Sequence, residues 1–288
     1  MTTNIAHRTW FVTGANSGIG LALTSAALRR GDNVVGLARN LEPLKDLADT
    51  HPAQLVVAAA DVRDQEAIDA AVAQGLEKFG RIDVVANNAG RGLVGAIEEI
   101  TAEQVQETLD INVVGRLNVL RAVLPTLRAQ RSGHVLELSS WLGQAGAPGF
   151  GGITMVKYAI EGVADALVEE LRPLGIHVTL VEPGPSATNF RANLAWGPNN
   201  LPEYDQSVRA ALTKIQALPE EHFNLAEQIV VAIMAAVDAD EPPRRLATGS
   251  VAVNSIREHL HERLADLELW ESISTAVDGD PARACPIT

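Results

Sequence analysis

Three closely spaced glycines follow the first apolar run of the chain. The segment TGANSGIG begins at Thr13 and leads directly into a predicted helix. Gly14, Gly18 and Gly20 would permit a tight turn, close approach of a pyrophosphate to the backbone, and close packing of helix against strand. The amide groups at the helix N-terminus would point at the phosphates. The segment therefore predicts a dinucleotide-binding loop, although a glycine-rich turn without a ligand has the same pattern.

Further short motifs follow this loop in an order that is typical of a known family. They are AADV with Asp61, NNAG at residues 87–90, INVVG with Asn112, and a PGxxxT segment formed by Pro183, Gly184 and Thr188. With TGxxxGxG, they make residues 8–250 resemble the classical short-chain dehydrogenase/reductase family. The resemblance implies a Rossmann-type fold and a nicotinamide dinucleotide cofactor. The cofactor-binding residues that it implies are Gly14, Ser17, Gly18, Ile19, Gly20, Arg39, Asp61, Val62, Asn88, Ala89, Gly90, Lys157, Pro183, Gly184 and Thr188.

The end of the second predicted strand indicates which dinucleotide is bound. An NAD-selective site needs a carboxylate here for the adenine ribose 2′-hydroxyl, but the sequence VVGLARN has Ala38 and Arg39 in that place. A guanidinium can pair with a 2′-phosphate through two hydrogen bonds, whereas a carboxylate would repel it. The sequence therefore favours NADP(H), and the Ser17 hydroxyl could add a bond to the same phosphate. A solvated arginine at a helix entrance is the alternative.

The catalytic segment departs from the family pattern. The resemblance assigns the catalytic serine to Ser140 in LSSWLG and the asparagine of the catalytic tetrad to Asn112. The family places its tyrosine thirteen residues after the serine and its lysine four residues further on. Counting from Ser140 reaches Ile153 and then Lys157, so isoleucine occupies the tyrosine position. The predicted catalytic residues are Ser140, Lys157, Asn112 and Ile153.

The missing phenol leaves several functions open. A general acid contributes about 10²–10⁴-fold to a rate, so the substrate itself would have to supply the proton, for instance from a phenol next to the ketone. This reading predicts an NADPH-dependent ketoreductase. The alternatives are a non-catalytic NADP-binding sensor or scaffold, which bound cofactor would stabilise, and a non-redox cyclase or lyase.

Apolar side chains near the catalytic segment and in residues 189–221 suggest the kind of substrate. They predict an apolar cleft with few charges, which suits ring-containing ketones better than sugars or acids. In this respect the chain resembles tailoring ketoreductases of aromatic polyketides, including those that act on angucyclinone-type rings. The predicted cleft residues are Leu93, Val94, Trp141, Leu142, Ile153, Phe190, Leu194 and Trp196.

Short aliphatic runs alternate with amphipathic segments through most of the chain, which predicts a doubly wound parallel α/β sheet. The predicted strands are Thr9–Thr13, Asn33–Leu37, Leu55–Ala59, Asp83–Asn87, His134–Ser139, His177–Glu182 and Arg245–Ala247. The predicted helices are Ile19–Arg30, Leu41–Asp49, Gln65–Phe79, Ala102–Ala129, Thr154–Leu171 and Ala226–Ala239.

Two segments interrupt or extend this alternation. Residues 189–221 are rich in Pro, Asn and Ala, and their length favours a lid over a site. Residues 251–288 contain an amphipathic pattern from Ser255 to Ala276, which predicts a helical extension packed on the same domain. Residues 1–250 would form the catalytic domain.

Composition limits the partners and the cellular setting. The 288 residues carry 23 basic and 36 acidic side chains, a net charge of −13, so nucleic acid is not an expected partner. Cys285 is the single cysteine, which excludes an intramolecular disulfide and a cysteine-rich metal site. No metal, no membrane segment and a cytoplasmic location are expected. The family resemblance implies a homodimer or homotetramer.

Overall fold

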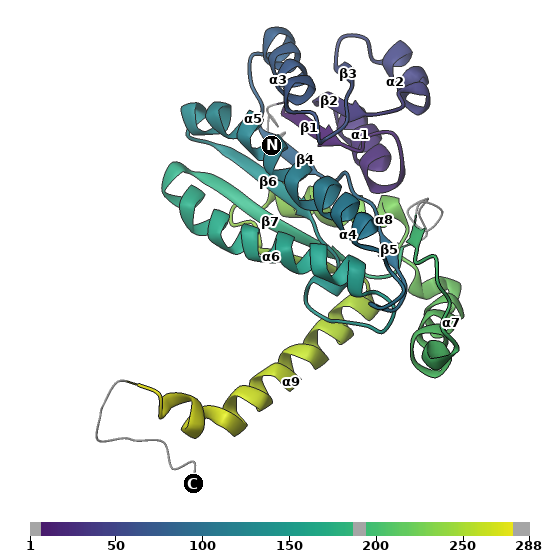
Figure 1. The fold of residues 1–288 in the computed structure, drawn as a ribbon. Helices are drawn as coiled ribbons and strands as arrows, with labels where there is room; N and C mark the ends of the chain where they lie inside the picture. Colours follow the sequence, from purple (N-terminus) through teal and green to yellow (C-terminus); the bar gives the residue numbers. More distant parts are fainter. Residues whose placement is uncertain (1–6, 187–193, 279–288) are drawn as a thin grey trace.

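A parallel sheet of seven strands forms the centre of the protein (Figure 1). The computed structural model describes residues 7–186 and 194–278. The strand order is β3-β2-β1-β4-β6-β7-β9, and each of the seven predicted strands agrees with an observed one to within one residue at either end. The strands are β1 (Thr9–Thr13), β2 (Asn33–Ala38), β3 (Leu55–Ala59), β4 (Val84–Asn87), β6 (Gly133–Leu138), β7 (Ile176–Pro183) and β9 (Arg245–Thr248). The predicted Rossmann-type α/β class is confirmed.

Strand β1 shows why the sheet is buried on both faces. All five of its residues are buried, and consecutive side chains point to opposite faces of a strand. Trp10 belongs to the apolar core on one face and Phe11 to the core on the other. Helices must therefore cover both faces, as the near-continuous apolar strands predict.

The helices divide between the two faces (Figure 1). Helices α3, α5 and α6 contribute Ile68, Val119 and Ile160 to one core. Helices α1 and α8 contribute Leu23 and Ile229 to the other. The larger helices are α1 (Gly18–Arg30), α2 (Lys45–Thr50), α3 (Gln65–Phe79), α4 (Ala102–Leu109), α5 (Gly115–Gln130), α6 (Gly151–Leu171), α7 (Ala210–Gln216), α8 (Ala226–Asp238) and α9 (Ser250–Thr275).

The long helix expected at Ala102–Ala129 is divided by a π turn. Helix α4 begins at a capping box in which Thr101 accepts from the Gln104 amide. A π turn at Asp110–Val114 then separates α4 from α5. The turn contains Asn112, and such π insertions in helices are common at functional sites.

The predicted lid segment is described from residue 194 onward. Strand β8 (Ala195–Trp196) pairs in parallel with β5 (Leu93–Val94), and α7 follows after short helical turns. Glu99 fastens this segment to the loop after β5, because it accepts from the Leu201 amide at 2.8 Å and from Arg209 Nη1 at 2.9 Å. The Arg209 guanidinium and the surrounding bonds lower the pKa of Glu99 to about 2.

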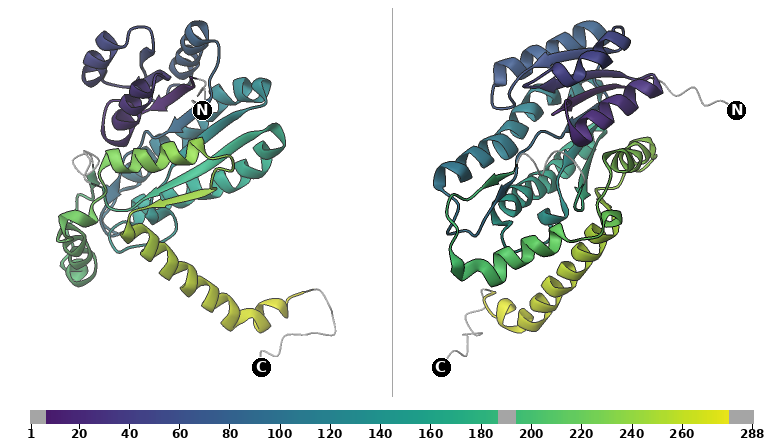
Figure 2. Two further views of the ribbon diagram at one scale, coloured as in Figure 1. Left: turned by 180° about the vertical axis from the view of Figure 1, so that it is seen from behind. Right: turned by 90° about the vertical axis from the view of Figure 1, so that its right-hand side faces the viewer.

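Helix α9 differs from the expected surface helix. Ala252 is buried where the first turns contact β9 and the turn at Trp141–Gly143. The rest of α9 extends away from the domain in Figure 1 and in the left view of Figure 2, and Leu264, Leu267 and Trp270 are exposed. The predicted packing on the domain is therefore wrong for most of the helix. Its apolar pattern resembled that of a helix packed on the domain, but its own domain covers only the first turns.

The described residues contain neither a candidate membrane-spanning helix nor a candidate metal site. None of their helices has the length and hydrophobicity that crossing a bilayer requires. None of their His, Cys, Asp and Glu side chains form a group of three or more that could hold a metal ion.

Candidate active site

A cleft of about 1200 Å³ opens at the carboxyl ends of the central strands. Ligands bind at this edge in open α/β sheets because the chain reverses its strand order there. The glycine loop after β1 lines one part of the cleft, and residues of α6 and α7 line another. The cleft therefore has room for a dinucleotide and a second molecule.

The glycine loop adopts the backbone that only glycine adopts easily. Gly14 and Gly18 have φ of +64° and +52°. A Cβ on Gly14 would lie 2.9 Å from Asn88 Nδ2, and one on Gly20 would collide with the Gly14 carbonyl. Gly14, Gly18 and Ile19 line the cleft, whereas Gly20 packs behind it. The predicted loop is thus present, with Gly20 in a packing role.

The N-terminus of α1 is open toward the cleft. Ser17 is the N-cap residue, its side chain makes no capping bond, and the first turn contains no acidic residue. The free amide groups and the positive end of the helix dipole favour an anion at this point. Ser17 itself lines the cleft. These features fit a pyrophosphate.

Arg39 and Asp61 lie at the same end of the cleft. Arg39 is exposed at the end of β2 and lines the cleft. Asp61 bonds Arg63 at 2.7 Å, and Arg63, with a smaller effect from Arg39, lowers the pKa of Asp61 to about 2. Val62 also lines the cleft. A permanently charged guanidinium thus faces the place where the adenosine half of a dinucleotide would lie.

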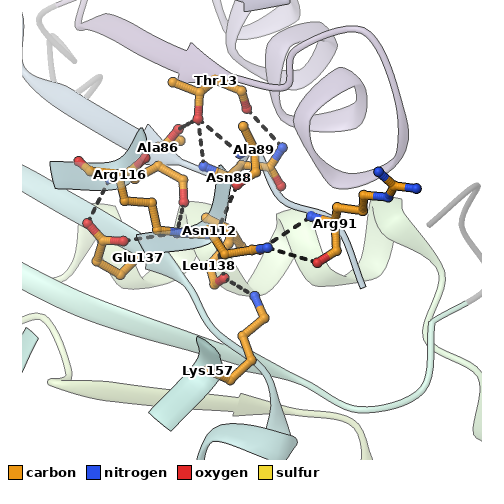
Figure 3. Close-up of polar contacts among 11 residues, drawn as sticks. Thr13, Ala86, Asn88, Ala89, Arg91, Asn112, Arg116, Glu137, Leu138 and Lys157 are labelled. Atoms are coloured by element: carbon orange, nitrogen blue, oxygen red, sulfur yellow. Dashed lines mark hydrogen bonds and ion pairs between the residues drawn. The ribbon is translucent and has the colours of Figure 1, made fainter. Parts of the chain in front are cut away.

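Thr13 joins the glycine loop to the segment after β4 (Figure 3). Its hydroxyl accepts from the amides of Asn88 at 2.9 Å and Ala89 at 3.0 Å. Asn88 Nδ2 donates to the Thr13 carbonyl at 2.9 Å. Asn88, Ala89 and Gly90 all line the cleft. The NNAG motif therefore fixes the two loops relative to each other.

A buried ion pair beneath the cleft was not predicted from the sequence. Arg116 on α5 donates to Glu137 Oε2 at 2.9 Å and to the Leu138 carbonyl at 3.0 Å (Figure 3). Asn87 Nδ2 donates to Glu137 Oε1 at 3.0 Å. Burial raises the pKa of Glu137 and lowers that of Arg116. The pair ties the ends of β4 and β6 to α5.

Lys157 lies on α6 below the same strand ends. Its Nζ donates to the Leu138 carbonyl at 2.7 Å, so Leu138 accepts from both Lys157 and Arg116. Burial, and then the nearby Arg116 guanidinium, lower the pKa of Lys157 well below its ordinary value. Lys157 lines the cleft.

Asn112 is held by the chain rather than facing the cleft. Its Nδ2 donates to the Arg91 carbonyl at 2.9 Å, and its Oδ1 accepts from the Arg91 amide at 3.3 Å (Figure 3). The same Nδ2 also donates to the Thr108 carbonyl at 2.9 Å. Ile111, but not Asn112, lines the cleft. In this structure Asn112 therefore positions the loop after β4 and stabilises the π turn.

Ser140 and Ile153 both line the cleft. The Ser140 hydroxyl accepts from the Leu142 amide at 3.2 Å and makes a long bond of 3.4 Å to the Pro183 carbonyl. Ile153 lies one helical turn before Lys157, is 4% exposed, and lines the cleft. Tyr158 instead donates to the Gln144 carbonyl at 2.9 Å and does not line the cleft.

The wall of the cleft around Ile153 is apolar, as predicted, but the residues that form it differ from the predicted ones. Leu93 and Val94 are fully buried and lie behind the wall, because β5 pairs with β8 there. Thr188 and Phe190 lie outside the described residues. The predicted residues Trp141, Leu142, Leu194 and Trp196 line the cleft, as do Pro183 and Gly184; sequence reasoning missed Arg91, Ser139, Phe150, Leu212 and Ile215.

These features define an oxidoreductase fold and site, and comparison with known proteins agrees. The model of the short chain dehydrogenase family matches residues 8–197. The chain belongs to the short-chain dehydrogenase family and is an oxidoreductase.

Three relatives illustrate the similarity. A solved short-chain dehydrogenase from Streptomyces avermitilis is 37% identical, with a TM-score of 0.88 over 95% of this chain and 100% of that one. Oxidoreductase BOA17 of Botryotinia fuckeliana is 35% identical over 93% of this chain and 98% of its own length. Estradiol 17-beta-dehydrogenase 1 of Rattus norvegicus is 32% identical over 94% and 86% of the two chains.

Proposed function

We propose that the protein is an NADP(H)-dependent ketoreductase that acts on a bulky, apolar, ring-containing ketone of the aromatic polyketide kind. One observation carries this proposal: a single cleft joins the glycine loop and Arg39 to Ser140, Lys157 and an apolar wall. The similarity to a relative named for estradiol is in keeping with a ring-containing substrate.

Arg39 is the basis for choosing NADP(H). A 2′-phosphate at the end of β2 would meet a guanidinium there, and Ser17 could add a hydroxyl from the glycine loop. The open N-terminus of α1 would hold the pyrophosphate, and Lys157 would reach the nicotinamide ribose. Pro183 and Gly184, with Thr188, would hold the carboxamide.

The side chains of the cleft then leave one role unfilled, which is donation of a proton to the ketone oxygen. Bound NADPH would supply the hydride. Ser140 can turn from its long bond to Pro183 and donate to the ketone oxygen, which polarises the carbonyl. Among the described residues, the ionisable side chains that line the cleft are Arg39, Asp61, Arg91 and Lys157, and no tyrosine is among them. Ile153 has no proton to give.

A substrate phenol next to the ketone would fill this task. Hydride addition at the carbonyl carbon creates an alkoxide, the neighbouring phenol transfers its proton to that oxygen, and the phenolate that remains is reprotonated by water. The internal hydrogen bond also polarises the ketone before the hydride arrives. The mechanism needs no acid from position 153.

A pair of matched substrates tests the proposal. An aryl ketone with an ortho or peri hydroxyl should oxidise NADPH, and its O-methyl ether should react more slowly by about 10²–10⁴-fold, the typical contribution of a general acid. Equal rates would contradict substrate assistance. Cofactor binding without oxidation by any hydroxyaryl ketone would favour the alternatives, a non-catalytic NADP-binding protein or a non-redox cyclase or lyase.

Two further features belong to the same proposal. Residues 189–221 act as a lid, which is supported by Leu212 and Ile215 in the wall of the cleft. Assembly as a homodimer or homotetramer through α5 and α6 remains a prediction, and sedimentation at micromolar protein concentration tests it.

A further inference from the structure

A pair of buried carboxyl groups lies behind the wall of the cleft. Glu161 on α6 and Glu182 near the end of β7 have side chains that are 7% and 2% exposed. The negative charge of Glu161 acts on Glu182, and the two carboxyl groups share their polar partners. Gln144 Nε2 donates to both, at 3.0 Å to Glu161 Oε2 and at 3.2 Å to Glu182 Oε1. The mechanism proposed above uses neither of them.

The charges around this pair do not balance if both groups are ionised. Arg245 on β9 places Nε at 3.1 Å from Glu161 and 3.5 Å from Glu182, and its Nη2 also bonds Asp165 at 2.7 Å. A single guanidinium thus forms ion pairs with three carboxyl groups. Lys157 lies one turn earlier on α6, and the negative charge of Glu161 acts on it against the effect of burial. Two buried carboxylates in contact repel each other unless they share a proton.

The titration of the two groups agrees with this geometry. Burial, and then the negative charge of Glu161, raise the pKa of Glu182 to about 7. Burial also raises the pKa of Glu161, although Ser139 and Arg245 oppose the rise. The pair therefore retains a proton below neutral pH and loses it as the pH rises through about 7.

The pair is joined to the cleft wall through a short turn. Gln144 directly follows the 3-10 turn Trp141–Gly143, which lines the cleft with Trp141 and Leu142. A Cβ on Gly143 would lie 2.7 Å from Ser139 Oγ and 2.9 Å from Glu161 Oε1, so turn and acid pair are in close contact. A change in the positions of the two carboxyl groups would therefore move the turn that lines the cleft.

We propose that Glu161 and Glu182 share one proton and act as positioning residues that hold the Trp141–Gly143 turn against the ketone. With the proton in place, Gln144 can bridge both carboxyl groups. Once the proton is lost, the two anions repel, Gln144 cannot hold both, and the turn moves away from the substrate. The cofactor half, built on the glycine loop and the ends of β2 and β3, is not affected. This inference rests on the proposed reduction of a ketone.

The pH dependence of ketone reduction is the first test. For the wild type, kcat/KM with a hydroxyaryl ketone should fall by about tenfold per pH unit above neutrality, as expected for loss of one essential proton. Glu182→Gln keeps a neutral group beside Glu161 and should remove this fall, whereas Asp165→Asn, which alters only the exposed partner of Arg245, should retain it. The Kd of NADPH should stay constant across the same range. A fall that persists in Glu182→Gln would overturn the inference.

Two measurements without substrate separate this inference from the proposed function. The infrared spectrum at pH 6 should contain a carboxylic acid C=O band that disappears above neutrality and is absent in Glu182→Gln. Emission from Trp141, obtained by subtracting the spectrum of Trp141→Phe, should change over the same pH range in the wild type and not in Glu182→Gln. Missing signals would refute the shared proton. If both signals are present but no ketone is reduced, the shared proton is supported and the proposed ketoreductase function is refuted.

Discussion

Replacement of Arg39 should change the choice of cofactor more than any other single substitution. The side chain is exposed at the end of β2, lines the cleft, and acts on Asp61 at the adenosine end. Hydrogen bonds to charged groups contribute about 1.5–3 kcal/mol. This range corresponds to a factor of roughly 10–150 in Kd. Because solvent screens an exposed arginine, Arg39→Ala should lie near the lower limit, a loss of about tenfold in NADPH affinity.

The two cofactors distinguish this effect from general damage. Arg39→Ala should leave the Kd of NADH nearly unchanged. Arg39→Asp should weaken the binding of NADPH further, because a carboxylate repels the 2′-phosphate of NADPH but accepts a hydrogen bond from the 2′-hydroxyl of NADH. Calorimetric titration of each variant with both cofactors measures these constants. Lys45→Ala, which removes an exposed cation from α2 outside the cleft, is the charge-matched control. Equal wild-type affinities for NADPH and NADH, or an equal loss of both in Arg39→Ala, would refute the reasoning.

Three further predictions concern the ion pairs and buried groups that stabilise the structure. Glu137→Gln leaves Arg116 buried without its counter-ion, so the free energy of unfolding measured in urea should fall by about 3–5 kcal/mol. An unchanged midpoint of urea unfolding would contradict the structural role of the pair. Arg209→Ala removes the ion pair with Glu99, so limited proteolysis should cut residues 194–216 faster, and wild-type protection would show that the segment is held by other contacts. Burial lowers the pKa of His134 to about 3, below its ordinary 6.5. Between these two values the unfolded state binds more protons than the folded state, so stability should fall as the pH drops from 6.5 toward 3. In thermal melts, His134→Gln should lose the contribution of this group to the dependence of stability on pH.

The sheet and the phosphate loop could be predicted from the sequence because their signals are local. Each buried strand is a short apolar run between turns, and Gly14 and Gly18 mark a backbone that few other residues adopt. The break between α4 and α5 could not be predicted in this way. It depends on bonds from Asn112 to Arg91, which is far from it in the sequence.

The polar network under the cleft was missed for the same reason. Arg116 and Glu137 lie on different elements, and each is unremarkable in its own segment. Glu161 and Glu182 meet because α6 packs on β7, a contact that no local pattern encodes. The apolar pattern of α9 is local, but it indicates a helix face without indicating what covers that face. This is why the predicted packing of α9 was wrong.

The apolar character of the cleft wall was predicted correctly, but not which residues form it. Ile153 lies in the wall as the family register implies, whereas Leu93 and Val94 lie behind it because β8 pairs with β5. Pairing between β5 and a segment about a hundred residues later has no sequence signal of its own. Apolar composition alone could not distinguish wall residues from core residues.

The central claim is hydride transfer from NADPH to a ketone in a site where Ile153 replaces the phenol. The most direct measurement is the fate of deuterium from NADPH labelled at the nicotinamide C4 position, with the unmodified protein and a hydroxyaryl ketone as substrate. We predict one deuterium at the carbinol carbon of the product for each NADPH oxidised, without any change at residue 153. Product without deuterium, or bound NADPH that stays unoxidised until Ile153→Tyr restores turnover, would contradict the account.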